Sequence, residues 1–215
     1  MDALFLARLE QLLYLYALPY DERFPVVCFD ERPCFLIGER VEGMAMKAGQ
    51  AAREHYSYTK HGSCALLMAL EPKTGTRLAR VYERRTKQEY ARFLKELAAS
   101  YPAAEKIRLV QDNLNTHTIG SLYEAFTPEE ARRLARRLEI HPTPVHGGWL
   151  NMAETELSIL ERQCLDRRLE AAATVRAEVI AWEAPRNRAR VTINWRFTVA
   201  DARVKLKSVY PSIKG

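Results

Sequence analysis

The sequence predicts an α/β protein in which a mixed sheet carries helices on both faces. Short apolar runs of strand length alternate with longer amphipathic segments, and helices dominate the C-terminal part. The 215 residues, of which 47% are hydrophobic and 28% charged, suffice for one such domain with a core. The chain has no internal repeat, low-complexity segment or clean linker. We therefore expect a single domain over residues 1–215.

The N-terminal part predicts a helix followed by two strands. Met1–Tyr16 places leucines and Tyr16 near one helical face, and Pro19 ends the helix. Pro25–Asp30 is a short apolar run of the kind found in a buried strand. After three polar or turn-forming residues, Cys34–Ile37 predicts a returning strand.

The next stretch predicts a loop and a hairpin. Glu39–Gly62 has no clear period, so we expect a long loop with a short strand near Glu54–Tyr58. Strands are predicted over Ser63–Leu70 and Arg77–Glu83. The Pro- and Gly-containing turn Glu71–Gly75 joins them into a hairpin.

The middle of the chain predicts a helix and a strand. Thr86 and Glu89 have the spacing of a capping box, and the helix that they start is expected to reach Ser100. Lys106–Gln111 predicts a strand, and Asn113–Tyr123 a loop with a helical part.

Two further helices and a strand follow. Thr127–Glu130 combines an N-cap, a proline at the first helical position and acidic residues in the first turn, and this helix is expected to reach Arg137. Leu138–Pro142 predicts a short strand. A turn-rich segment over Thr143–Trp149 then leads into a helix from Met152 to Leu165.

The C-terminal part predicts two more helices. They are expected over Ala171–Trp182 and Thr198–Val209, the second with Thr198 as N-cap. Between them lie a basic turn over Pro185–Arg190 and the segment Val191–Trp195, which suits either a short strand or an extended segment.

Charge and cysteine content point to a polyanionic partner and a reducing compartment. The net charge of +6 suits nucleic acid, although solvated helix faces explain any one arginine cluster equally well. The four cysteines show no CxxC spacing, so we expect free thiols rather than zinc. No run approaches 18 apolar residues, and the N-terminus lacks a signal peptide, so a cytoplasmic protein without membrane contact is expected. The arginines that recur through the second half are Arg132, Arg133, Arg136, Arg137, Arg162, Arg167, Arg168, Arg186, Arg188 and Arg190.

Three carboxylates are candidates for a metal site. Two predicted buried strands run into an aspartate, Asp30 and Asp112, and Glu154 lies in the first turn of a predicted helix. Strand ends open into crevices, and Mg²⁺ prefers a few carboxylate oxygens together with substrate phosphate. Turn chemistry and helix capping explain each acid singly. Their convergence on divalent metal ions is our hypothesis.

The neighbours of these acids have expected roles of their own. Glu31 should point to the opposite face of the strand from Asp30, where it either contacts a supporting partner or is solvated. His117 is expected to orient Asp112, contact a phosphate or cap its loop. Asn113 and Asn151 are expected to hold the backbone near the acids. His146 and Trp149 are expected to support their loop by packing.

The blocks around the three acids resemble the signature blocks of DDE transposases. These blocks are Cys28-Phe29-Asp30-Glu31, Val110-Gln111-Asp112-Asn113-Leu114-Asn115-Thr116-His117 and Trp149-Leu150-Asn151-Met152-Ala153-Glu154. Their order and spacing are similar to those of the bacterial insertion-sequence branch (the six-thirty family) of the Tc/mariner superfamily. The resemblance extends from about Leu4 to Tyr210.

The resemblance implies a ribonuclease H-like fold, with a five-stranded sheet, and Mg²⁺-dependent cleavage and transfer of DNA strands during transposition. It implies that Asp30, Asp112 and Glu154 are the catalytic acids and hold two Mg²⁺ ions, with Mn²⁺ as a substitute. Glu156 would point about 200° away from Glu154 on the same helix. The implied partners are transposon ends and target DNA, bound by a cytoplasmic, nucleoid-associated bacterial protein.

The chain departs from that family in one respect. The resemblance implies a longer chain, in which helix-turn-helix modules precede the catalytic domain. The segment before Asp30 shows no pair of helices of the helix-turn-helix kind. We therefore expect this DNA-binding region to be absent, and expect either a homodimer or a mixed assembly with a helix-turn-helix-containing chain. The alternatives are a non-catalytic DNA-binding remnant that interferes with an intact transposase, and another nuclease of the same fold.

Overall fold

A five-stranded mixed sheet forms the centre of the molecule. The computed structural model describes residues 3–39 and 58–211, and the strand order in them is β3-β2-β1-β4-β5. β1 and β2 pair antiparallel, as do β2 and β3, whereas β1–β4 and β4–β5 are parallel. The predicted mixed sheet is confirmed. The strands are β1 Val26–Glu39, β2 Tyr58–Glu71, β3 Thr76–Tyr82, β4 Ile107–Gln111 and β5 Leu138–Pro142.

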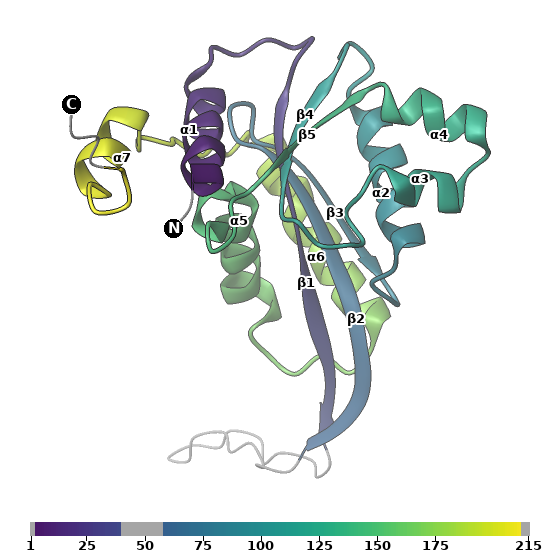
Figure 1. The fold of residues 1–215 in the computed structure, drawn as a ribbon. Coiled ribbons are helices and arrows are strands. Elements are labelled where there is room, and N and C mark those ends of the chain that lie inside the picture. The colour runs from purple at the N-terminus through teal and green to yellow at the C-terminus, as the bar shows by residue number, and fades with distance from the viewer. Residues whose placement is uncertain (1–2, 40–57, 212–215) are drawn as a thin grey trace, which may run out of the picture.

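Helices cover both faces of this sheet (Figure 1). Helices α2, α3 and α4 pack on one face, and α1, α5 and α6 on the other. In β1, Val27 and Phe29 belong to the first core and Cys28 to the second, as expected for a central strand between two helical layers. The helices are α1 Ala3–Ala17, α2 Lys87–Ser100, α3 Gly120–Ala125, α4 Pro128–Ala135, α5 Met152–Leu160, α6 Ala172–Arg188 and α7 Val199–Lys205.

Strand β1 is continuous, and the predicted break after Asp30 is wrong. Its pairing with β2 runs from Cys28 opposite Leu70 to Glu39 opposite Tyr58, and Pro33 lies inside it. β4 pairs with only the first residues of β1, so the strand has a free edge at Pro33. A proline is tolerated there because its missing N–H faces no partner strand. β2 begins at Tyr58, within the predicted loop, and the rest of the short strand expected near Glu54 lies outside the described residues.

Helix α6 is longer than predicted. It continues through Pro185 to Arg188, where a basic turn was expected. The side chain of Asn187 explains the extension, because it accepts a hydrogen bond from the N–H of Arg77 at 2.8 Å and donates one to the carbonyl of Arg77 at 2.9 Å. These two hydrogen bonds satisfy the N–H and the carbonyl of Arg77, which face outward from the edge strand β3.

Two helix boundaries also differ from the prediction. Helix α5 ends at Leu160, and a π-helical turn continues to Leu165. At α2, the Thr86 hydroxyl contacts the Glu89 carboxylate instead of capping a backbone N–H. The capping box at Thr198 is present, and the segment before it is extended without strand pairing. In the described ranges, no helix is long and apolar enough to cross a membrane.

Candidate functional site

The parallel pairing of β1 and β4 brings Asp30 and Asp112 to the same level. The last pair in this ladder is Cys28 with Val110. Asp30 lies two residues after Cys28, and Asp112 lies two residues after Val110. Side chains alternate along a strand, and Cys28 and Val110 both belong to the core on the α1 and α5 side. Asp30 therefore points toward that side of the sheet, and Asp112 lies just beyond the end of β4.

Helix α5 brings Glu154 to the same side. Its first residues, Met152 and Ala153, pack into the same core as Cys28 and Val110. Asn151 ties the start of the helix to β1, because its Oδ1 accepts from the N–H of Ala153 at 3.1 Å and its Nδ2 donates to the carbonyl of Phe29 at 2.8 Å. The predicted backbone-holding role of Asn151 is confirmed.

Gly148 makes room for the Glu154 carboxylate. A Cβ atom added at Gly148 would lie 2.3 Å from Oε1 of Glu154, which no real contact allows. The glutamate therefore lies against the bare backbone of the preceding turn. A side chain at Gly148 would push the carboxylate away from its position.

The three carboxylates repel one another. Burial raises the pKa of Asp30 to about 7, and the charges of Glu154 and Asp112 add to the rise, against a hydrogen bond from the N–H of Glu31. Burial also raises the pKa of Glu154, with the charge of Asp112 as a second cause. A cation bound among them would relieve this repulsion.

His117 links Asp112 to Glu31. Its Nδ1 lies 2.5 Å from Oδ1 of Asp112, and its Nε2 lies 3.3 Å from Oε2 of Glu31, an ion-pair contact without good hydrogen-bond geometry. Burial lowers the pKa of His117, but the two carboxylates outweigh it and raise the pKa to about 9. Burial raises the pKa of Asp112, but His117 outweighs it, so this pKa lies below its ordinary value.

This arrangement decides among the roles expected for His117 and Glu31. The imidazole orients Asp112, and Glu31 lies on the opposite face from Asp30 with a supporting partner. The Glu31 carboxylate also lies 2.9 Å from the guanidinium of Arg85, a contact that the sequence analysis missed. The side chains of Glu31 and His117 are only 4% and 1% exposed, so the pair is internal.

Two further side chains occupy the expected places. Asn113 donates to the carbonyl of Thr143 at 2.7 Å and accepts from Arg8 at 3.3 Å, which holds the backbone beside Asp112. Glu156 is fully buried, with Oε1 at 2.6 Å from Nε of Arg77 and 2.9 Å from Nε of Arg186. Glu156 is thus part of the core, whereas Glu154 is exposed.

The donor set suits a hard divalent cation. Carboxylate oxygens are the ligands that Mg²⁺ takes in proteins, and it usually keeps waters and shares substrate phosphate oxygens. Among the residues that the structure describes, no three His, Cys, Asp or Glu side chains form a ready metal cluster. Asp30, Asp112 and Glu154 are thus close enough to interact electrostatically but do not form a closed cage.

The arginine clusters divide into internal and exposed members. Arg137 donates to the carbonyls of Ala98 and Ala104, and Arg186 pairs with the buried Glu156. These two arginines stabilise the fold. Arg132, Arg133 and Arg188 are exposed, although Arg133 lies 3.7 Å from the Glu130 carboxylate.

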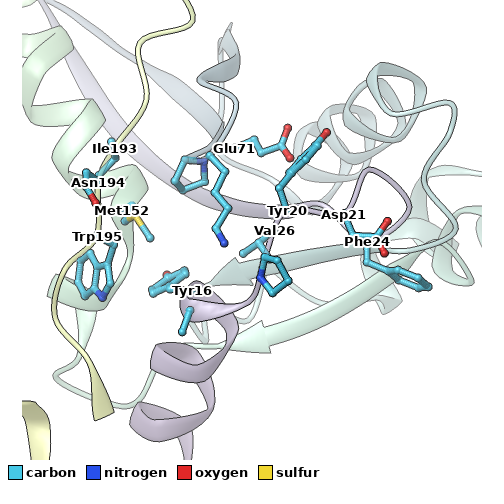
Figure 2. A pocket seen from close by; sticks show the side chains of 14 residues that line it. Tyr16, Tyr20, Asp21, Phe24, Val26, Glu71, Met152, Ile193, Asn194 and Trp195 are labelled. Atoms are coloured by element: carbon cyan, nitrogen blue, oxygen red, sulfur yellow. The ribbon is translucent and has the colours of Figure 1, made fainter. Parts of the chain in front are cut away.

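A pocket of about 330 Å³ lies apart from the three carboxylates. Figure 2 shows Tyr20 and Glu71 together on one wall and Tyr16 beside Trp195 on another. The rings of Tyr16 and Trp195 are 5.3 Å apart. None of Asp30, Asp112 and Glu154 lines this pocket, so we assign it no part in their chemistry.

Comparisons with known proteins give the chain a family. A family model described as DDE superfamily endonuclease matches residues 25–176, which contain all three acids. No curated protein matches the chain.

Solved structures of the Mos1 transposase share the fold. The Mos1 mariner paired-end complex with Mn has a TM-score of 0.55 at 15% identity, over 89% of this chain and 58% of that chain. The Mos1 strand transfer complex has a TM-score of 0.59 at 15% identity, over 87% and 55%. The ribonuclease H-like α/β fold predicted from the sequence is therefore confirmed. This chain spans less than two thirds of the length of those chains.

Proposed function

The chain belongs to the DDE superfamily endonuclease family, and from this we propose that it is a transposase catalytic domain that cleaves and transfers DNA strands. The observation that carries the proposal is that Asp30 and Asp112 each lie two residues beyond the last β1–β4 pair, Cys28 with Val110, and that Asn151 ties the helix of Glu154 to β1. Two carboxylates from neighbouring strands and a glutamate on an adjacent helix suit phosphoryl transfer assisted by metal ions.

The proposed cofactor is Mg²⁺, two ions of it, with Mn²⁺ as a substitute, held by Asp30, Asp112 and Glu154. Bound there, the ions would activate an attacking water or 3′-hydroxyl and stabilise the leaving oxygen. Asp112 stays ionised through His117 and is ready to ligate. Asp30, whose pKa burial raises to about 7, would hold an ion in its ionised form. Support for metal use comes from a Mos1 mariner paired-end complex whose name includes Mn.

The proposed substrates are transposon ends and target DNA. The net charge of +6 and the exposed arginines support a polyanionic partner. The related structures are named as paired-end and strand transfer complexes. We place the chain in the bacterial insertion-sequence branch, the six-thirty family, as a cytoplasmic single catalytic domain that associates with the nucleoid. Its proposed assembly is a homodimer or a complex with a helix-turn-helix-containing chain.

The test is a nicking assay on supercoiled plasmid with Mg²⁺ or Mn²⁺. We expect the wild type to nick DNA, and expect Asp30→Asn, Asp112→Asn and Glu154→Gln to lose nicking. Glu22→Gln, an exposed acid on a remote loop, serves as the matched control and should keep full activity. Salt-sensitive DNA binding without nicking in the wild type would instead identify a non-catalytic remnant. Unchanged nicking in all three variants would refute the site assignment.

A further inference from the structure

Two large apolar side chains are exposed on the loop that joins β5 to α5, residues 143–151. Val145 is 66% exposed and Trp149 is 46% exposed. One end of the loop is bonded beside Asp112, because the N–H of Thr143 donates to the carbonyl of Gln111 at 2.8 Å. Its other end runs directly into α5 and Glu154. The exposed parts of the Val145 and Trp149 side chains are not used in the core. They could contact a ligand at the rim of the carboxylate site.

The loop is held rigidly. The N–H of Gly147 donates to the carbonyl of Pro144 at 2.8 Å, and that of Asn151 donates to Gly148 at 2.7 Å. The buried hydroxyl of Tyr16 donates to the carbonyl of Leu150 at 2.7 Å. These bonds fix the backbone on both sides of Trp149. Ligand binding to Trp149 would therefore cost little conformational entropy of the loop backbone.

The indole of Trp149 is supported from one side. Its ring meets Phe197 edge-on, with centroids 5.7 Å apart. Phe197 comes from the extended segment before α7 and packs against the core that holds Cys28 and Val110. Almost half of Trp149 remains exposed despite this support. An aromatic ring that is supported on one side and open on another can accept a flat ligand.

We infer that Trp149, with Val145 on the same loop, is a stacking platform for an unpaired nucleobase of the DNA strand at the carboxylate site. This inference rests on the proposed function. Where a DNA strand is unpaired at a protein surface, its bases can stack on an aromatic side chain. Such stacking accepts any base because every base has a π-face. Trp149 is a positioning residue, since it lies on the rim and not among the carboxylates.

The nearby charge favours DNA over a protein surface as the occupant. Arg8 of α1 donates to Asn113, the residue after Asp112, and so places a cation on the same rim. A guanidinium held beside the residue that follows Asp112 suits a DNA phosphate. A second copy of the chain on this loop is the competing occupant, and the experiment below separates the two.

The experiment compares two duplexes in EDTA, which prevents cleavage. Both carry the same single-stranded overhang, with thymine bases in one and abasic sites in the other. We expect the wild type to bind the thymine overhang about fivefold to a hundredfold more tightly, as measured by fluorescence anisotropy. Trp149→Ala should lose this preference, and Trp149→Tyr should keep most of it. Trp182→Phe, at a buried tryptophan bonded to Gln163, is the matched control and should keep it fully.

Two results would overturn the inference. One is no thymine preference in the wild type. The other is an unchanged thymine preference in Trp149→Ala, and if that variant also loses self-association, as seen by sedimentation, the loop is assigned to a protein contact. Asp30→Asn separates this test from the proposed function. It should lose nicking and keep the thymine preference, so each property can fail without the other.

Discussion

Nδ1 of His117 lies 2.5 Å from Oδ1 of Asp112, and the same imidazole faces Glu31 on its other side. The histidine therefore joins a residue at the end of β4 to one in the middle of β1. Its ring packs against Phe29 and Tyr90, with centroids 5.0 and 4.8 Å away. The orientation of Asp112 is thus set by a buried side chain.

Replacing His117 should weaken metal binding and nicking together. Groups that orient ligating carboxylates typically contribute about 10- to 100-fold to metal affinity or activity. We expect a loss of this size in His117→Ala and a smaller one in His117→Gln, which retains a donor. Calorimetric Mn²⁺ titration and nicking rates measure the two effects. The control is His61→Gln, on the exposed start of β2, and equal Mn²⁺ affinity in all three variants would contradict this role.

The unfolding free energy of the metal-free protein should fall as pH rises through about 7. Asp30 has a folded pKa of about 7 against an ordinary value of 3.8. Its neutral form is favoured by folding, so its contribution to stability is complete below pH 3.8 and is lost as pH rises through 7. Asp30→Asn should reduce the stability difference between pH 5 and pH 8. Urea denaturation in EDTA measures it, and Glu22→Gln should match the wild type.

Adding Mn²⁺ should reverse this loss in the wild type. An ion that binds only the folded state stabilises it by mass action. At pH 8 the wild type should gain stability with increasing Mn²⁺, and Asp30→Asn should gain much less. An equal gain in both proteins would show that Asp30 is not a ligand.

Glu154 and Glu156 should separate activity from stability. Glu156→Gln breaks an ion pair with Arg77 in which both side chains are 0% exposed, which should cost about 3–5 kcal/mol of unfolding free energy. Glu154→Gln changes an exposed residue of the same helix and should alter stability by less than about 0.5 kcal/mol while removing nicking. Chemical denaturation and the nicking assay measure the two properties. Similar stability of the two variants would argue against the buried pair as a determinant of the fold.

Asn151 should be required for alignment of the two catalytic elements. Asn151→Ala removes a helix cap that contributes about 1 kcal/mol and also leaves the buried carbonyl of Phe29 without its donor. Asn151→Asp keeps the cap acceptor but cannot donate to that carbonyl. Both variants should therefore nick slowly, and only Asn151→Ala should show faster hydrogen exchange in the first turn of α5. Full nicking by Asn151→Asp would show that the bond to β1 is dispensable.

Elements with strong local signals were predicted closely. β5 has the predicted bounds Leu138–Pro142, and α4 begins after the predicted cap Thr127, whose hydroxyl accepts from the N–H of Glu130. These signals act within a few residues and survive in any tertiary setting. The continuity of β1 through Pro33 could not be predicted from local signals, because only the free strand edge there makes a proline acceptable.

The sequence by itself determined the α/β class, the family resemblance and the three candidate acids, because apolar runs, caps and motif spacing are local properties of the chain. Only the tertiary structure decided which side chains support those acids. His117, which follows β4, contacts Glu31 of β1. Asn151 donates to a carbonyl 122 positions away in the sequence, and Asn187 donates to that of Arg77, 110 positions away. A buried polar group takes whichever partner the packing brings within reach, and that partner is set by strand order and helix placement.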